Sequence, residues 1–192
     1  MAVGPSLRNT HGRSLIELLL VIIILGILVG IAYPAIDALR SNAEAAMLQV
    51  STALQAAQRE AVARQHDVLV IFDAPRNRFQ LVFDANNNGI GDGSERTRGV
   101  VLEPQIVFGR AAAPARAFGN GPVTLSNGSQ MLVFHRNGSA SASGGLYLTS
   151  VKAAAGDPKR LRDTRAIEIT RATGRIEWFK YTGAGTTWTR SF

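Results

Sequence analysis

The chain has 192 residues, 46% of them hydrophobic, and a formal net charge of +7 that is spread along its length. It has no cysteine, which excludes disulfides, thiol catalysis and thiolate metal sites. This length allows one modest globular domain with its own core, and dispersed positive charge is typical of a solvated basic surface.

An uninterrupted apolar stretch lies near the N-terminus. Residues 18–36 contain no acidic residue, lysine, arginine or histidine, and Glu17 stands directly before them. As a helix rising about 1.5 Å per residue, this run covers roughly 29 Å, the thickness of the hydrocarbon core of a bilayer. We therefore expect a transmembrane helix over about residues 15–36. Because Arg8 and Arg13 precede it, the positive-inside rule predicts a cytoplasmic N-terminus and an exported remainder.

Two ordinary explanations leave Glu17 unaccounted for. A cleavable secretory signal would have a shorter apolar core and a small-residue cleavage site before a polar mature start, and neither is evident. A plain signal anchor would explain the span, but a carboxylate there costs a few kcal/mol unless it is paired or reaches the interface. Snorkelling of Glu17 to the headgroups is the simplest alternative to a pairing role.

The spacing of Gly12, Glu17 and Pro34 around this run resembles the N-terminal signature of the type IV pilin superfamily, which includes pilins and the pseudopilins of type II secretion. The resemblance implies that a prepilin peptidase removes a leader, residues 1–12, by cutting between Gly12 and Arg13. It also implies N-methylation of Arg13 and a role for Glu17 in subunit assembly. The implied partners are other pilin or pseudopilin subunits, the peptidase, the membrane and an inner-membrane assembly platform.

The physical interpretation of Glu17 agrees with this resemblance. A free amino terminus at Arg13 would lie about one helical turn from the carboxylate, on the same subunit or on a neighbour, and would supply a cation. Pro34 removes a backbone donor and can kink or loosen the helix, which a transfer from bilayer to filament would tolerate.

The helical pattern continues beyond the apolar run. Apolar residues recur every three or four positions from Ile36 to Ala61, which predicts an amphipathic second half of one helix from about Ser14 to about Gln65. We divide the chain into the leader, this helix over residues 13–66, and a β-rich periplasmic domain over residues 67–192.

Short β-branched and aromatic runs follow, separated by Gly, Asn and Pro. They predict an α+β fold with an antiparallel sheet packed on the helix. The stretches 110–121 and 151–164 read as loops. The predicted strands are Val68–Phe72, Phe79–Phe83, Gln105–Phe108, Val123–Leu125, Met131–His135, Gly145–Thr149, Ala166–Arg171 and Arg175–Tyr181.

This second half of the chain, with a turn after Phe134 and a closing hairpin at Gly174, resembles the GspH/FimT branch of the superfamily. The resemblance implies a non-enzymatic minor pseudopilin at or near the tip of a type II secretion pseudopilus. It implies residence in the bacterial inner membrane before assembly. The alternatives are a FimT/FimU-like minor pilin of a type IV pilus, with a role in DNA uptake, and a single-pass periplasmic enzyme or calcium-binding protein.

Two constellations suggest ligands. Residues 84–95 reproduce the ligand spacing of a twelve-residue calcium loop, although strands flank them and Asn-Gly and Asp-Gly also favour plain turns. No other cofactor is expected. The ligands would be Asp84, Asn86, Asn88, the carbonyl of Ile90, Asp92 and Glu95.

The second constellation is basic and aromatic, and could grip DNA by phosphate pairing and stacking. Gly174 and Arg175 resemble the start of the Gly-Arg element of DNA-binding FimT-like pilins. The alternative is an ordinary strand with Arg175, Glu177 and Lys180 outward and Ile176 and Trp178 inward. The basic residues of this constellation are Lys159, Arg160, Arg162, Arg165, Arg171, Arg175 and Lys180.

No enzyme motif is evident. The three histidines, His11, His66 and His135, have no metal-ligand neighbours at useful spacing, and the nucleophile-elbow, His-Glu-x-x-His and phosphate-loop patterns are missing. We expect His135 to be a structural strand residue.

Overall fold

The computed structural model describes residues 11–191, with the side chains of residues 11–14 and 29–39 outside the description. It contains one long helix, α1 (His11–Arg64), which confirms the predicted helix. Gln65 ends α1 with a left-handed φ of 58°. The chain forms two compact units that meet within α1, one ending at Ala38 and the other beginning at Leu39.

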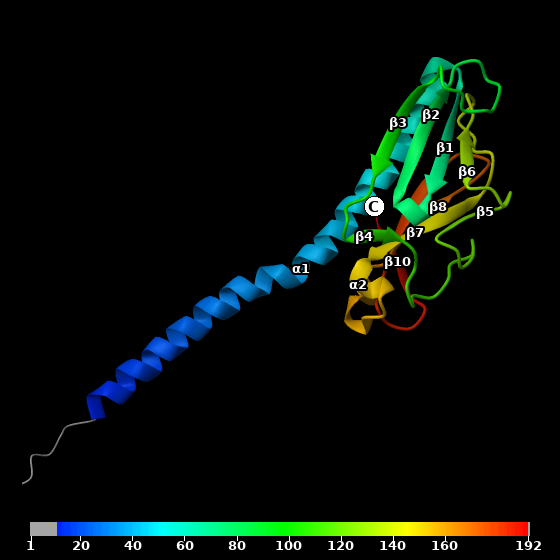
Figure 1. Cartoon of the computed structure of the whole chain (residues 1–192). Coiled ribbons are helices and arrows are strands. Elements are labelled where there is room, and N and C mark those ends of the chain that lie inside the picture. Colours follow the sequence, from blue (N-terminus) through cyan, green and yellow to red (C-terminus); the bar gives the residue numbers. More distant parts are fainter. Residues whose placement is uncertain (1–10, 192) are drawn as a thin grey trace, which may run out of the picture. The chain divides into compact units, whose positions relative to one another are not determined.

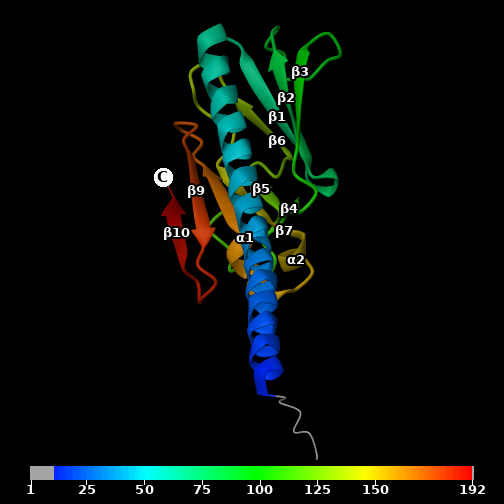
Figure 2. The ribbon, with the colours of Figure 1, turned by 90° about the vertical axis from the view of Figure 1, so that its left-hand side faces the viewer.

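The part of α1 in the second unit carries the predicted apolar stripe. Its residues at three- and four-residue intervals are at most 1% exposed, because they pack into one hydrophobic cluster with residues of both sheets. Figure 2 shows this half of the helix running across the strands. The positions that are at most 1% exposed are Ala43, Ala46, Met47, Val50, Leu54, Ala57 and Ala61.

Ten strands follow among the described residues, all of them paired antiparallel, so the predicted α+β fold is confirmed (Figure 1). They are β1 (Asp67–Asp73), β2 (Arg78–Asp84), β3 (Arg96–Val101), β4 (Ile106–Phe108), β5 (Val123–Leu125), β6 (Met131–Phe134), β7 (Gly144–Ser150), β8 (Arg165–Ile169), β9 (Ile176–Tyr181) and β10 (Trp188–Ser191).

The strands form two sheets. One has the order β3-β2-β1-β6, and the other has the order β10-β9-β8-β7-β4, with β5 also paired to β7. The predicted β1–β2 hairpin is confirmed, with Val70 opposite Leu81. The two strands missing from the prediction, β3 and β10, are both edge strands, which bury few side chains and so carry a weak hydrophobic pattern.

The stretch predicted as a loop over residues 151–164 is partly helical, which corrects the sequence interpretation. It holds a short helix, α2 (Val151–Ala154), whose N-cap Ser150 accepts a hydrogen bond from the Ala153 N–H, and a 3₁₀ helix at Pro158–Asp163. Pro158 and the N-cap Asp157 favour the 3₁₀ helix. Elements this short show little hydrophobic periodicity, so the sequence pattern did not predict them.

Polar contacts attach α1 to both sheets. Lys180 on β9 pairs with Glu44, and the Arg96 guanidinium on β3 lies 2.7 Å from the Glu60 carboxylate. The Lys180 ammonium holds the pKa of the Glu44 carboxyl below its usual value, so this contact weakens at acid pH. Lys180 therefore faces the helix, not solvent as the strand alternation had predicted.

Candidate functional site

The apolar segment of α1 over residues 15–28 is exposed in the single chain. Every residue from 15 to 28 is exposed, and the large apolar side chains range from 47% exposed at Val21 to 74% at Leu15. Glu17 is the one charged residue in this run. An exposed surface this apolar is unfavourable in water. We therefore expect an apolar environment to surround this segment in the functional state of the protein.

Several predicted positions fall beyond the described side chains. The structure describes the helical backbone at Gly12, Arg13 and Pro34, but not their side chains, and the same holds for the second part of the predicted span, residues 29–36. The cleavage, methylation and kink therefore stay predictions. Within the described residues, no helical window reaches the length and mean hydropathy of a membrane span.

The loop at residues 84–95 connects β2 to the unpredicted strand β3. Asp84 is fully buried at its start, and its two carboxylate oxygens accept hydrogen bonds from the N–H groups of Asn88 (3.0 Å) and Gly89 (2.7 Å). The Asn88 side-chain oxygen accepts the Ile90 N–H at 2.8 Å. The side-chain oxygens thus serve first to satisfy the turn's own backbone.

Further along this loop, Asp92 accepts hydrogen bonds from the hydroxyl (2.6 Å) and N–H (3.2 Å) of Ser94. These bonds hold the pKa of the Asp92 carboxyl below its usual value. Within the described part of the chain, no three acidic or imidazole side chains are gathered as a metal site. Calcium binding by Asp84, Asn86, Asn88, Ile90, Asp92 and Glu95 stays a prediction, whose direct check is calcium calorimetry.

A side chain of α1 holds the turn between β8 and β9 in place. Gly174 lies there with φ +61°, and the Gln58 side-chain amide donates to the carbonyls of Gly138 (2.7 Å) and Thr173 (2.9 Å). One side chain of α1 therefore joins two hairpin turns, which are more than thirty residues apart in sequence. Gly174 therefore lies in a turn that packs against Gln58, a structural role that the resemblance to a Gly-Arg element did not suggest.

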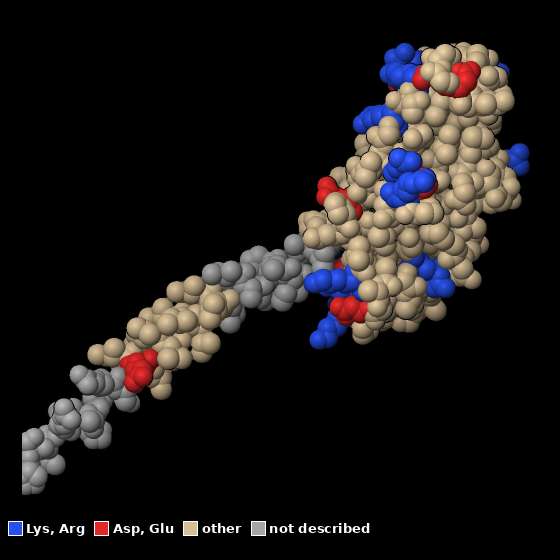
Figure 3. Space-filling view, viewed as in Figure 1, with Lys and Arg blue, Asp and Glu red and all other residues tan. Residues whose placement is uncertain are grey.

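The predicted basic constellation does not form one surface. Arg165 is 1% exposed, and burial lowers the pKa of its guanidinium, while Arg175 pairs with Glu177. Lysines and arginines are scattered over the face shown in Figure 3. DNA binding through Gly174 and Arg175 stays a prediction.

Sequence reasoning singled out neither Gln58, which joins two turns, nor Arg98, which lines a cavity. The sequence around Gln58 suggests an exposed position on the helix. Only the tertiary structure shows that its side chain donates to two backbone carbonyls. Arg98 lies on the unpredicted strand β3 and lines the space between β3 and α1. The pattern Arg96-Thr97-Arg98-Gly99 gave no apolar alternation that could have located that strand.

Comparison with known proteins gives two matches to family models. The family described as "Type II transport protein GspH" matches residues 46–172, and the "Prokaryotic N-terminal methylation motif" matches residues 7–33. The fold is also similar to the minor pseudopilin EpsH from the Type 2 Secretion System of Vibrio cholerae, at 12% identity and a TM-score of 0.47, covering 72% of this chain and 97% of that one. No curated protein sequence matches the chain.

Proposed function

Because this chain belongs to the GspH family of type II transport proteins and is a minor pseudopilin of the type II secretion system, we propose that its N-terminal helix first anchors it in the inner membrane and then carries it into the pseudopilus. In this proposal the protein is a structural subunit without an enzymatic activity. Following the resemblance of its sequence, we place it at or near the tip of the filament.

The exposed apolar segment of α1 over residues 15–28 is the observation that supports the proposal. Large side chains on all sides of residues 15–28 are exposed, so an apolar medium has to surround this segment completely. Lipid would provide that medium before assembly, and the helices of other subunits would replace it afterwards. Pseudopilins assemble with other pseudopilin subunits, so the second covering is available.

Glu17 has a place in the same scheme. Proteolysis between Gly12 and Arg13 would create an ammonium about one turn away, and a neighbouring helix would bring such a group alongside. The prepilin peptidase and the inner-membrane assembly platform are partners that the proposal requires. A buried carboxylate and ammonium that meet only in the packed filament would favour one register of the helices.

Deletion of the gene and complementation test this function. We expect the deletion strain to retain type II secretion substrates in the periplasm and the full chain to restore their release. A version that starts at Leu39, and so lacks the apolar segment, should not restore it. Normal secretion in the deletion strain, with loss of pili or of DNA uptake, would favour the minor-pilin alternative instead.

A further inference from the structure

The edge of the four-stranded sheet is open along β3. Leu102 donates its N–H to the carbonyl of Asn77 at 2.9 Å, and Val101 lies opposite Arg78 in the ladder. In an antiparallel ladder with this register, alternate residues of β3 direct their N–H and C=O groups away from β2. These residues are Thr97, Gly99 and Val101.

In the described part of the chain, one of these outward groups has a partner. The Gln49 side-chain amide of α1 donates to the Val101 carbonyl at 3.4 Å. The remaining outward groups, from Thr97 to Val101, form a row about 13 Å long at the spacing of a strand. Such a row is a template for another extended chain.

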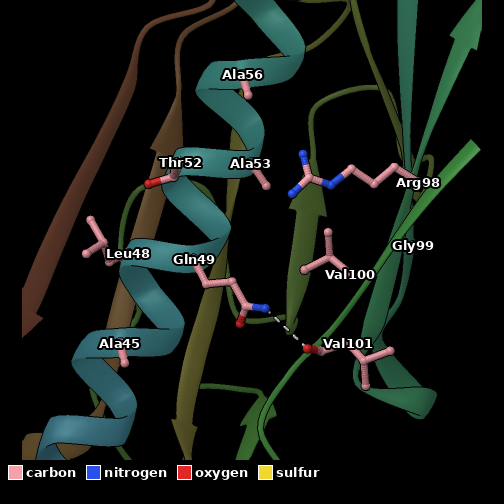
Figure 4. A pocket seen from close by; sticks show the side chains of 10 residues that line it. All are labelled: Ala45, Leu48, Gln49, Thr52, Ala53, Ala56, Arg98, Gly99, Val100 and Val101. Atoms are coloured by element: carbon pink, nitrogen blue, oxygen red, sulfur yellow. Dashed lines mark hydrogen bonds between the residues drawn. The ribbon is translucent and has the colours of Figure 1, made fainter.

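A groove runs beside this open edge. A cavity of about 520 Å³ lies between α1 and β3, with small α1 residues such as Ala53 and Ala56 forming one wall. Figure 4 shows the Arg98 side chain extending from β3 toward α1, with Gln49 closing the end at Val101. A second cavity of about 220 Å³ shares Ala56 and Arg98 and extends toward Glu60.

The residues at the rim of the groove and the charge inside it indicate what kind of segment could bind there. Leu48 and Val101, which are 59% and 65% exposed, present apolar side chains on its two sides. Arg98 lies in both cavities, and no described carboxylate is within salt-bridge distance of it, whereas the neighbouring Arg96 pairs with Glu60. The groove thus combines apolar walls with one uncompensated cation.

We propose that this groove binds an extended segment of a partner protein, which adds as a strand to the open edge of β3 and places an acidic side chain against Arg98. A helix laid in the groove would leave the outward N–H and C=O groups of Thr97 and Gly99 without partners, whereas a strand satisfies them. The acid supplies the charge that the groove lacks. The periplasmic location of this partner rests on the proposed function, but the groove itself does not.

Peptide binding to the full chain in detergent micelles tests the proposal. The probe is a fluorescein-labelled peptide of alternating valine and threonine with one central glutamate, and the measurement is fluorescence anisotropy. We expect it to bind about tenfold more tightly than the same peptide with lysine in place of glutamate, because attraction by Arg98 becomes repulsion. Methylation of alternate backbone nitrogens should abolish binding, because it removes the donors of a strand.

Arg98→Glu should reverse the order of the two peptides, whereas Arg136→Glu, at an exposed arginine outside the groove, should preserve it. Both variants change the net charge equally, and circular dichroism checks that both remain folded. The proposal is overturned if no peptide binds, if Arg98→Glu leaves the order unchanged, or if the methylated peptide binds equally well. Because secretion is not measured, failure here is separate from failure of the proposed function.

Discussion

Glu17→Gln leaves the protein folded and in the membrane but removes it from the pseudopilus. The substitution keeps the size and shape of the side chain, but it replaces one carboxylate oxygen with an NH2 group and so deletes the charge. If the carboxylate meets an ammonium between packed helices, loss of one partner leaves the other charge buried and unpaired, which costs about 3 kcal/mol or more. Incorporation should therefore fall by about 100-fold. The measurement is the amount of the chain that copurifies with other pseudopilins, compared with the amount in the membrane fraction.

Glu60→Gln is the matched control, because it makes the same chemical change on the same helix. Glu60 forms partly exposed ion pairs with Arg64 (2.6 Å) and Arg96 (2.7 Å) within the domain. Pairs of this kind contribute little to stability. Incorporation of this variant should match that of the wild type. Normal incorporation of the Glu17→Gln variant would contradict the pairing role and support simple snorkelling.

Gly174→Ala strongly destabilises the globular domain. A Cβ at this position would lie 2.3 Å from the Gly138 carbonyl oxygen and 2.4 Å from the Gln58 amide nitrogen. The φ of +61° adds strain of about 1–2 kcal/mol for a residue with a side chain. The turn must move and the bonds of Gln58 must lengthen, so we expect a total loss of about 3 kcal/mol or more in the free energy of unfolding. Thermal and denaturant unfolding measure it.

Gly128→Ala is the control that separates the cost of backbone strain at positive φ from the cost of the steric clash at Gly174. Gly128 has a similar φ of +68°, but a Cβ there meets nothing within 4 Å. This variant should lose about 1–2 kcal/mol, through strain alone. Equal losses at Gly174 and Gly128 would show that the contacts among Gln58, Gly138 and Gly174 contribute nothing. The comparison also tells whether altered DNA binding in a Gly174 variant reflects recognition or lost packing.

The sequence predicted the fold where periodicity was strong. The three- and four-residue spacing of Met47, Val50 and Leu54 identified the buried face of α1, because helix geometry places such residues on one side. The β1–β2 hairpin followed from two β-branched and aromatic runs around a proline-containing turn. Strand β3 was missed because its exposed residues, with a pattern rich in arginine, obey no burial requirement.

The candidate sites were less accessible to sequence reasoning, since tertiary contacts decide them. Arg165 reads as a surface cation beside other basic residues, yet it is buried at the start of β8, where its guanidinium donates to the carbonyls of Arg162 and Thr164. Asp84 reads as a metal ligand, yet both its oxygens accept backbone N–H groups. The spacing of residues shows which side chains could act as ligands. It does not show which of them already bind other groups of the folded protein.

The mass of the mature protein, isolated from its host, tests the central claim most directly. If the chain is a processed pseudopilin whose N-terminus pairs with Glu17, mass spectrometry will find that the protein begins at Arg13, with the leader of residues 1–12 removed. A chain that still begins at Met1, or one cut near Tyr33 at the end of the apolar run, would contradict the account, because neither could place an ammonium beside Glu17.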